Sequence, residues 1–250
     1  MKNTAKKIAW ILWKGWFYLL VLVVIVILSP LLILSLSTEK TYSFFFKLAK
    51  IWAYIVYYGT GFSIRYKTPI VPLQEKNYLF VANHNSMMDI MLMLILVNKP
   101  FVFVGKQELA NIPIFGYFYK KSCILVDRKS AASRQQTMKS AAEKLSKGLS
   151  VCIFPEGGVS DDKTLLLDSF KDGAFRLAIE FQLPIQPYCF VGLRGGFPFD
   201  FFGGKPKTID VFQLQLYPTK GLTSKDKEEL KINVRNEIYE TLLQYPFEEI

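Results

Sequence analysis

His84 is the residue whose possible chemistry is most narrowly defined, because the sequence contains one histidine. It lies in NHNSMMD (residues 83–89), directly after an apolar run. A histidine can take a proton from a hydroxyl group, and a neighbouring carboxylate can hold its ring in the required tautomer. On a continuous helix, His84 and Asp89 would lie about 140° apart and could not pair. If a helix instead begins near Ser86, Asp89 lies in its first turn and can reach back to His84, which predicts an acid–base pair.

The same residues also allow a purely structural interpretation. Ser86 and Asp89 have the spacing of a capping box, in which two side chains bind backbone N–H groups at the start of a helix. Asp89 would then serve the helix rather than His84. The residues alone leave both interpretations open. A metal site built from several histidines is excluded by the single histidine.

Two cations and a glycine turn form a second group of candidate site residues. Lys106 and Arg128 lie at the two ends of residues 105–128, and FPEGG (154–158) follows an apolar, strand-like run. The backbone N–H groups of such a turn can face an anion. A surface ion pair between Asp127 and Arg128, and an ordinary turn at FPEGG, are the alternatives. The sequence has no GxSxG motif, complete dinucleotide-binding loop or P-loop, so a serine triad is not supported.

Apolar runs alternate with helical ones from about residue 64 onwards. The apolar runs are continuous rather than alternating in polarity, which is typical of strands buried on both faces. This order predicts an α/β fold with a central, largely parallel sheet flanked by helices. We expect strands at residues 78–83, 101–105, 123–127, 151–155, 185–192 and 209–217, helices up to 97, near 115 and at 130–147, 170–182 and 224–244, and a loop at 194–207.

The first 62 residues predict a membrane anchor. Residues 16–36 are apolar apart from Ser29, Pro30 and Ser35, and they are long enough to cross a bilayer. They are also too long for the apolar part of a signal peptide. A second stretch, at residues 44–62, mixes aromatic and lysine side chains and suits the headgroup level. The pair predicts either a helical hairpin or a span followed by an interfacial helix.

Basic charge is concentrated in this anchor. The chain has a net charge of +10, and residues 1–60 hold seven lysines and one acid, hence +6. A nucleic-acid binder is one interpretation. A cationic anchor on anionic lipid is favoured, because it explains the charge and the apolar segment together. The positive-inside rule then leaves the N-terminus cytoplasmic, and we expect the globular part on the cytoplasmic face as well. Three widely spaced cysteines build no disulfide framework, which agrees with a reducing compartment.

Four blocks in order resemble those of the glycerolipid acyltransferase family, specifically its 1-acylglycerol-3-phosphate acyltransferase group. NHNSMMD matches the NHx4D block of that group, and the other blocks are similar to GKQELANIPIFGYFYKKSCILVDR (105–128), FPEGG and LPIQPYCF (183–190). The resemblance implies transfer of a fatty acyl group from acyl-CoA or acyl carrier protein to the 2-hydroxyl of lysophosphatidate, in phospholipid synthesis at a membrane. It implies an anchor at residues 1–62, an α/β acyltransferase domain at 63–250, and no metal or resident cofactor.

The resemblance also implies roles for individual residues. His84 would be the general base and Asp89 its partner, while Lys106 or backbone N–H groups near FPEGG would stabilise the oxyanion. Substrate-binding roles are implied for Ser86, Lys106, Arg128, Glu156, Gly157 and Gly158. Cys123 and Cys152 are expected to be core residues, because no second histidine is present to activate them.

Two departures from the group concern the headgroup of the acceptor. Gly158 and Val159 stand where the group has Thr-Arg, which removes a cation associated with phosphate binding, and Ser122 stands where a glycine usually precedes VDR. An acyltransferase for another lysolipid, such as a lyso-ornithine lipid, is therefore one alternative. A catalytically silent, lipid-binding membrane module is the other.

Overall fold

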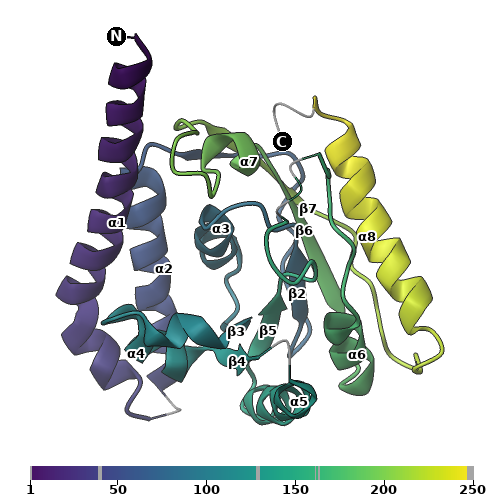
Figure 1. Cartoon of the computed structure of the whole chain (residues 1–250). Coiled ribbons are helices and arrows are strands. Elements are labelled where there is room, and N and C mark those ends of the chain that lie inside the picture. Colours follow the sequence, from purple (N-terminus) through teal and green to yellow (C-terminus); the bar gives the residue numbers. More distant parts are fainter. Residues whose placement is uncertain (1, 39–40, 128–129, 161, 163, 247–250) are drawn as a thin grey trace.

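In the computed structural model, the strands form one mostly parallel, seven-stranded sheet (Figure 1). The structure describes residues 2–38, 41–127, 130–160, 162 and 164–246. In sheet order the strands are β1 (Ser63–Tyr66), β7 (Thr208–Gln213), β6 (Ile185–Val191), β2 (Leu79–Ala82), β5 (Ser150–Ile153), β3 (Phe101–Lys106) and β4 (Ile124–Val126). The pair β6–β7 is antiparallel and the other neighbouring pairs are parallel. The predicted α/β fold with a central, largely parallel sheet is confirmed.

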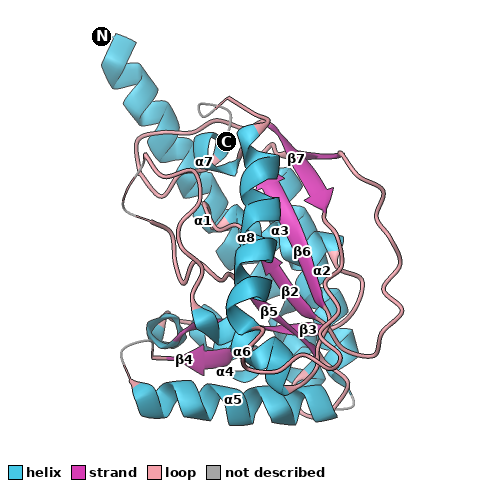
Figure 2. Cartoon of the chain, turned by 90° about the vertical axis from the view of Figure 1, so that its right-hand side faces the viewer, coloured by secondary structure: helices cyan, strands magenta, loops and turns pink. Residues whose placement is uncertain are grey.

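Helices cover both faces of this sheet. In chain order they are α1 (Lys2–Ser35), α2 (Tyr42–Gly59), α3 (Met88–Leu96), the 3₁₀ helix η2 (Gln107–Asn111), α4 (Phe115–Ser122), α5 (Ala131–Ser146), α6 (Asp172–Glu180), α7 (Leu193–Gly196) and α8 (Lys227–Leu243). Figure 1 shows α3 between the sheet and the pair α1–α2, with α6 and α8 on the opposite side. The rotated view in Figure 2 shows α8 in front of β6, where the carbonyl of Ile238 lies 3.9 Å from the Cys189 sulfur.

The burial of the central strands explains why they appear in the sequence as continuous apolar runs. All four residues of β2 are buried, and so are all seven residues of β6. In the register, Phe80 of β2 faces Cys152 of β5 on one side and Gln186 of β6 on the other. A strand with parallel neighbours on both sides and helices on both faces has no solvent-facing surface, so its apolar residues do not alternate.

The two N-terminal helices are attached to the sheet domain as well as to each other. Trp52 Nε1 of α2 donates to the carbonyl of Val21 in α1 at 3.3 Å. Lys50 Nζ donates to the carbonyl of Val97, just beyond α3, at 2.9 Å. Within the described part of the chain, α1 is the helix long and apolar enough to cross a membrane, over Thr4–Ser35. The second expected anchor segment forms α2, which does not meet that criterion.

Three details of the chain differ from the expectation. Strand β1 was not predicted, because its four residues are mostly exposed and it exists only through pairing with β7. The expected loop at 194–207 contains most of the short helix α7. The strand expected at 209–217 ends at Gln213, and Tyr217 keeps only an isolated bridge to Ile185.

Candidate active site

The carboxyl ends of four neighbouring strands supply the candidate site. In sheet order these strands are β6, β2, β5 and β3, and all four are parallel. Residues 192–194 follow β6, residues 83–86 follow β2, and FPEGG (154–158) follows β5. Lys106 is the last residue of β3. Parallel strands bring their carboxyl ends to one edge of a sheet, where open α/β proteins place their sites. The sheet order therefore brings segments that lie far apart in the sequence to one edge.

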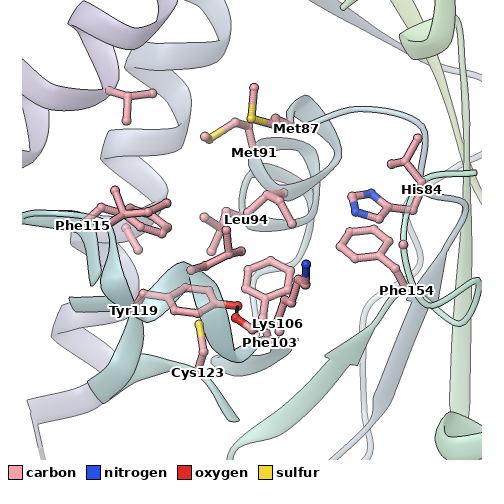
Figure 3. A pocket seen from close by; sticks show the side chains of 18 of the residues that line it. His84, Met87, Met91, Leu94, Phe103, Lys106, Phe115, Tyr119, Cys123 and Phe154 are labelled. Atoms are coloured by element: carbon pink, nitrogen blue, oxygen red, sulfur yellow. Dashed lines mark hydrogen bonds between the residues drawn. The ribbon is translucent and has the colours of Figure 1, made fainter. Parts of the chain in front are cut away.

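His84 and Asp89 form the predicted pair. His84 Nδ1 lies 2.8 Å from Asp89 Oδ2, and the imidazole stacks on Phe154 with ring centroids 4.3 Å apart (Figure 3). Helix α3 begins at Met88, so His84 precedes the helix and Asp89 is in its first turn. Because Asp89 is a hydrogen-bond acceptor when ionised, Nδ1 carries the proton in this contact. Nε2 is then the ring nitrogen that can accept a proton.

Asp89 also binds backbone N–H groups at the start of helix α3, as the structural interpretation of the motif predicts. Its Oδ2 also accepts the backbone N–H groups of Asn85 at 2.7 Å and Ser86 at 2.9 Å. The side chain is 1% exposed, and burial raises the pKa of Asp89 while its hydrogen bonds oppose that shift. Pairing with His84 and stabilisation of the helix start therefore coexist on one carboxylate oxygen.

Ser86 is placed behind this turn rather than at its surface. Its side chain is fully buried, its hydroxyl donates to the carbonyl of Phe197 at 2.7 Å, and it accepts the N–H of Met88 at 3.1 Å. Both hydrogen bonds hold the start of α3. The substrate-binding role expected for Ser86 is not favoured by this position, because its hydroxyl is committed to the protein.

Glu156 links the FPEGG turn to the histidine turn. Its Oε1 accepts the N–H of His84 at 2.6 Å, and its Oε2 accepts the N–H of Asp168 at 3.0 Å. Burial raises the pKa of Glu156 to about 7. The carboxylate thus uses both oxygens on backbone donors, one of which belongs to His84, and its substrate-binding role stays a prediction.

Gly157 and Gly158 line a cavity next to His84. Gly157 has φ +82°, and a Cβ added there would also lie 3.3 Å from Lys171 Cγ. Only glycine adopts this conformation without strain. The turn therefore brings bare backbone to the cavity wall. The N–H of Gly157 donates to the carbonyl of Phe154 at 3.1 Å, so the N–H of Gly158 is the one that could meet an anion or an oxyanion.

The two predicted cations have different outcomes. Lys106 ends β3 and lines the same cavity; its side chain is 55% exposed and its Nζ lies 3.7 Å from Glu108 Oε1 (Figure 3). Arg128 lies outside the described residues, so its role stays a prediction.

The cavity has a volume of about 1290 Å³ and two unlike ends. Its polar end holds His84, the Gly157–Gly158 turn and residues 159, 160 and 162. Its apolar part runs between helices α1, α2, α3 and α4, and its wall there includes Phe17, Phe45, Trp52, Met91, Leu94 and Phe115. Figure 3 shows Met87, Met91 and Leu94 on one side of this space, with His84 and Phe154 at its edge. An aliphatic chain reaching His84 can therefore be covered by protein along its length.

The cysteines are unsuited to covalent catalysis. Cys152 is fully buried in β5, in agreement with the expectation of a core residue. Cys123 instead lines the cavity beside Tyr119 (Figure 3), and burial raises the pKa of its thiol to about 12. A thiol needs to lose its proton to act as a nucleophile, so this shift disfavours an acyl-cysteine route.

Arg194 is the functional candidate that the sequence analysis did not identify. It lies in α7, directly after β6, and it lines the polar end of the cavity. Its Nη2 is 3.4 Å from the side-chain oxygen of Asn85. The signal in the sequence is an arginine among glycines (GLRGG) directly after a buried strand, where a parallel sheet exposes its site.

Comparison with known proteins agrees with this geometry. The Acyltransferase family model matches residues 63–191. The chain is 29% identical over 177 residues to 1-acyl-sn-glycerol-3-phosphate acyltransferase beta of Homo sapiens, covering 68% of this chain and 60% of that protein. It is 34% identical over 131 residues to the 1-acyl-sn-glycerol-3-phosphate acyltransferase of Salmonella typhimurium, covering 52% and 53% respectively. The match thus spans about half to three fifths of the length of these relatives.

A solved structure shares the fold over almost the whole chain. The 1-acyl-sn-glycerophosphate acyltransferase PlsC from Thermotoga maritima superposes with a TM-score of 0.79 at 24% identity, covering 96% of this chain and 97% of that one. The family match includes the His84–Asp89 pair, the FPEGG turn and the strands that carry them. The chain belongs to the Acyltransferase family, and the relatives it resembles are 1-acyl-sn-glycerol-3-phosphate acyltransferases.

Proposed function

We propose that the protein transfers a fatty acyl group from an acyl thioester to the 2-hydroxyl of lysophosphatidate, giving phosphatidate. The observation that supports this most directly is the His84 Nδ1–Asp89 Oδ2 hydrogen bond of 2.8 Å beside a long apolar cavity. A general base and a compartment for an acyl chain are what the reaction requires. Acyl-CoA or acyl carrier protein is the proposed co-substrate, and the scheme uses no metal or resident cofactor.

The proton is proposed to move through His84. Nε2 takes the proton of the acceptor hydroxyl while the hydroxyl oxygen attacks the thioester carbonyl, and the new C–O bond forms a tetrahedral intermediate. Collapse of this intermediate breaks the C–S bond, and the imidazolium returns its proton to the departing thiolate. Asp89 stabilises the imidazolium between these steps, as a buried carboxylate bound to Nδ1 does in a triad.

Charge on the intermediate needs hydrogen-bond donors. The backbone N–H of Gly158 and the ammonium group of Lys106 are the proposed oxyanion partners, because both residues line the cavity near His84. Arg128 stays a proposed ligand of the acceptor phosphate on the strength of the resemblance.

Residues 1–62 are proposed to anchor the protein to a membrane, with the catalytic domain on the cytoplasmic face. Helix α1 combines length and composition suitable for crossing with a row of exposed apolar side chains, among them Leu12, Leu19, Ile27 and Leu34. The other face of this helix packs against the domain. The exposed apolar row is therefore available for contact with lipid.

Mass spectrometry of the products from a panel of acceptors tests the proposal. Full-length protein in vesicles is given acyl-CoA or acyl carrier protein thioester together with lysophosphatidate, a lyso-ornithine lipid or monoacylglycerol. Phosphatidate as the main product supports the proposal. A product from the lyso-ornithine lipid alone would assign a different acceptor, and no product from any pair would make the chain a silent lipid-binding module.

A further inference from the structure

Strand order places one cation on each side of His84. Along the sheet, the segment after β6 carries Arg194, the segment after β2 carries His84, the segment after β5 carries FPEGG, and β3 ends at Lys106. Among the lysines and arginines that the structure describes, Lys106 and Arg194 are those that line the cavity. Arg194 is one strand away from the histidine strand, whereas Lys106 is two strands away on the other side.

Arg194 reaches the residue that follows His84. Its Nη2 lies 3.4 Å from Asn85 Oδ1 and 3.4 Å from the carbonyl of Leu166. Asn85 itself lines the cavity, so the guanidinium stands at the polar end, next to the proposed base. Burial lowers the pKa of Arg194, and the carboxylates of Glu156 and Asp162 oppose that shift. An arginine stays charged under such opposing influences, so the polar end of the cavity contains a fixed positive charge.

The backbone that carries Arg194 is held tightly. Gly192, just before α7, has φ +110°, and a Cβ there would lie 3.0 Å from Lys207 Cε. The backbone N–H of Phe197, just after α7, donates to the carbonyl of Leu193 at 2.8 Å. The turn out of β6 therefore has a defined geometry, as a residue that orients a ligand requires.

We propose that Arg194 binds the phosphate of the acceptor lipid and thereby selects phosphorylated lysolipids. The inference rests on the proposed function. In lysophosphatidate the phosphate is attached to the carbon next to the one that bears the reacting hydroxyl. A cation that contacts Asn85, the residue after His84, therefore suits this acceptor. The phosphates of a thioester donor lie at the far end of its pantetheine arm. The planar fork of arginine donates two parallel hydrogen bonds to a phosphate, which an ammonium group cannot do.

This position also accounts for Val159. Val159 lines the same cavity, and its side chain offers no charge and no hydrogen-bond donor, although the resembled group has an arginine at that position. Arg194 enters the polar end of the cavity from α7, the short helix after β6. The phosphate-binding charge is thus supplied from the segment after β6 rather than from the turn after β5.

Steady-state kinetics of the full chain in vesicles test the inference. Acceptor and donor are varied in turn for the wild type, Arg194→Ala, Arg194→Lys and the matched control Arg176→Ala, whose side chain is 71% exposed on α6. Loss of a charge-assisted bond predicts that Arg194→Ala raises the KM for lysophosphatidate by about 10- to 150-fold. The KM for the acyl donor stays unchanged, Arg194→Lys recovers part of the loss, and Arg176→Ala behaves as the wild type.

Other outcomes overturn the inference in distinguishable ways. A rise in donor KM alone would assign the phosphate to the donor, and equal changes in both KM values would give Arg194 a structural role. If Arg194→Ala does not fold, Arg194→Lys and Arg194→Gln are compared by equilibrium binding of lysophosphatidate without donor, and equal affinities would refute the inference. A wild type that transfers no acyl group to any lysolipid would instead refute the proposed function.

Discussion

The Oε1 atom of Glu156 accepts the backbone N–H of His84 at 2.6 Å. This hydrogen bond joins two residues that are 72 positions apart in the sequence, and it does so at the backbone nitrogen of the proposed base. The second oxygen of the same carboxylate accepts the N–H of Asp168 at 3.0 Å. A side chain that satisfies two backbone donors from different segments holds both segments in register.

Replacement of Glu156 by glutamine should therefore lower the stability of the fold, although the shape of the side chain is preserved. The amide offers one acceptor where the carboxylate offers two, so one buried N–H group is left unsatisfied. This predicts a loss of about 1–3 kcal/mol in the free energy of unfolding, together with reduced turnover. Urea denaturation measures the first effect. Glu180→Gln, at a side chain that is 48% exposed, is the matched control and should change neither quantity.

The dependence of stability on pH follows from the same group. The pKa of Glu156 is raised from an ordinary 4.5 to about 7, so the folded state holds a proton over this range that the unfolded state has released. The contribution of this group to stability consequently falls as the pH rises from about 4.5 to about 7. The wild type should therefore lose part of its stability advantage over Glu156→Gln, which does not titrate at this position, as the pH rises through this range. A difference that is the same at every pH would contradict this assignment.

Asp89→Asn tests the pair with His84. The change keeps the size of the side chain but removes the charge that stabilises the imidazolium and selects its tautomer, and a comparable change in a triad costs about 10⁴ in kcat. We expect a loss of that order here, and a similar or greater loss for His84→Ala. Asp172→Asn, a surface residue that binds Lys231 at 2.7 Å, is the control for the substitution itself. Near-normal turnover in His84→Ala would exclude the general-base role.

The apolar part of the cavity should set the range of acyl chains. Met91 lines the cavity and is 4% exposed (Figure 3), so Met91→Trp puts a larger side chain into this space. Overfilling such a site should reduce the use of long acyl chains more than that of short ones. Competition between donors of different length, with products measured by mass spectrometry, tests this. Ile232→Trp, on the exposed face of α8, should leave the ratio of products unchanged.

Membrane association should resist salt. Exposed apolar residues of α1 rather than lysines are expected to dominate binding, and their burial in lipid is not screened by ions. Full-length protein should therefore stay on anionic vesicles in high salt, as measured by flotation. Release by salt alone would show that the association is electrostatic.

Sequence patterns predicted those features that depend on residues close together in the chain. The buried strands around Phe80 and Cys152 produce continuous apolar runs, and the spacing of His84 and Asp89 allows a contact across one turn. The positions of Ser86, Glu156 and Arg194 depend on which strands are neighbours. A carboxylate that binds a backbone N–H group 72 residues away has no local signature in the sequence. Strand β1 escaped prediction for the same reason, because it is stabilised by pairing with β7 rather than by its own apolar pattern.

Because α1 and α2 form part of the cavity wall, the surroundings of these helices border the substrate compartment. Phe17 and Trp52 face this compartment, while residues such as Leu19 and Ile51 on the same helices face outwards. A detergent that loosens the two helices would therefore change the shape of the compartment while His84 and Asp89 stay intact. Preparations of equal purity in different detergents should differ in turnover and in preferred chain length, and reconstitution into bilayers should remove the difference.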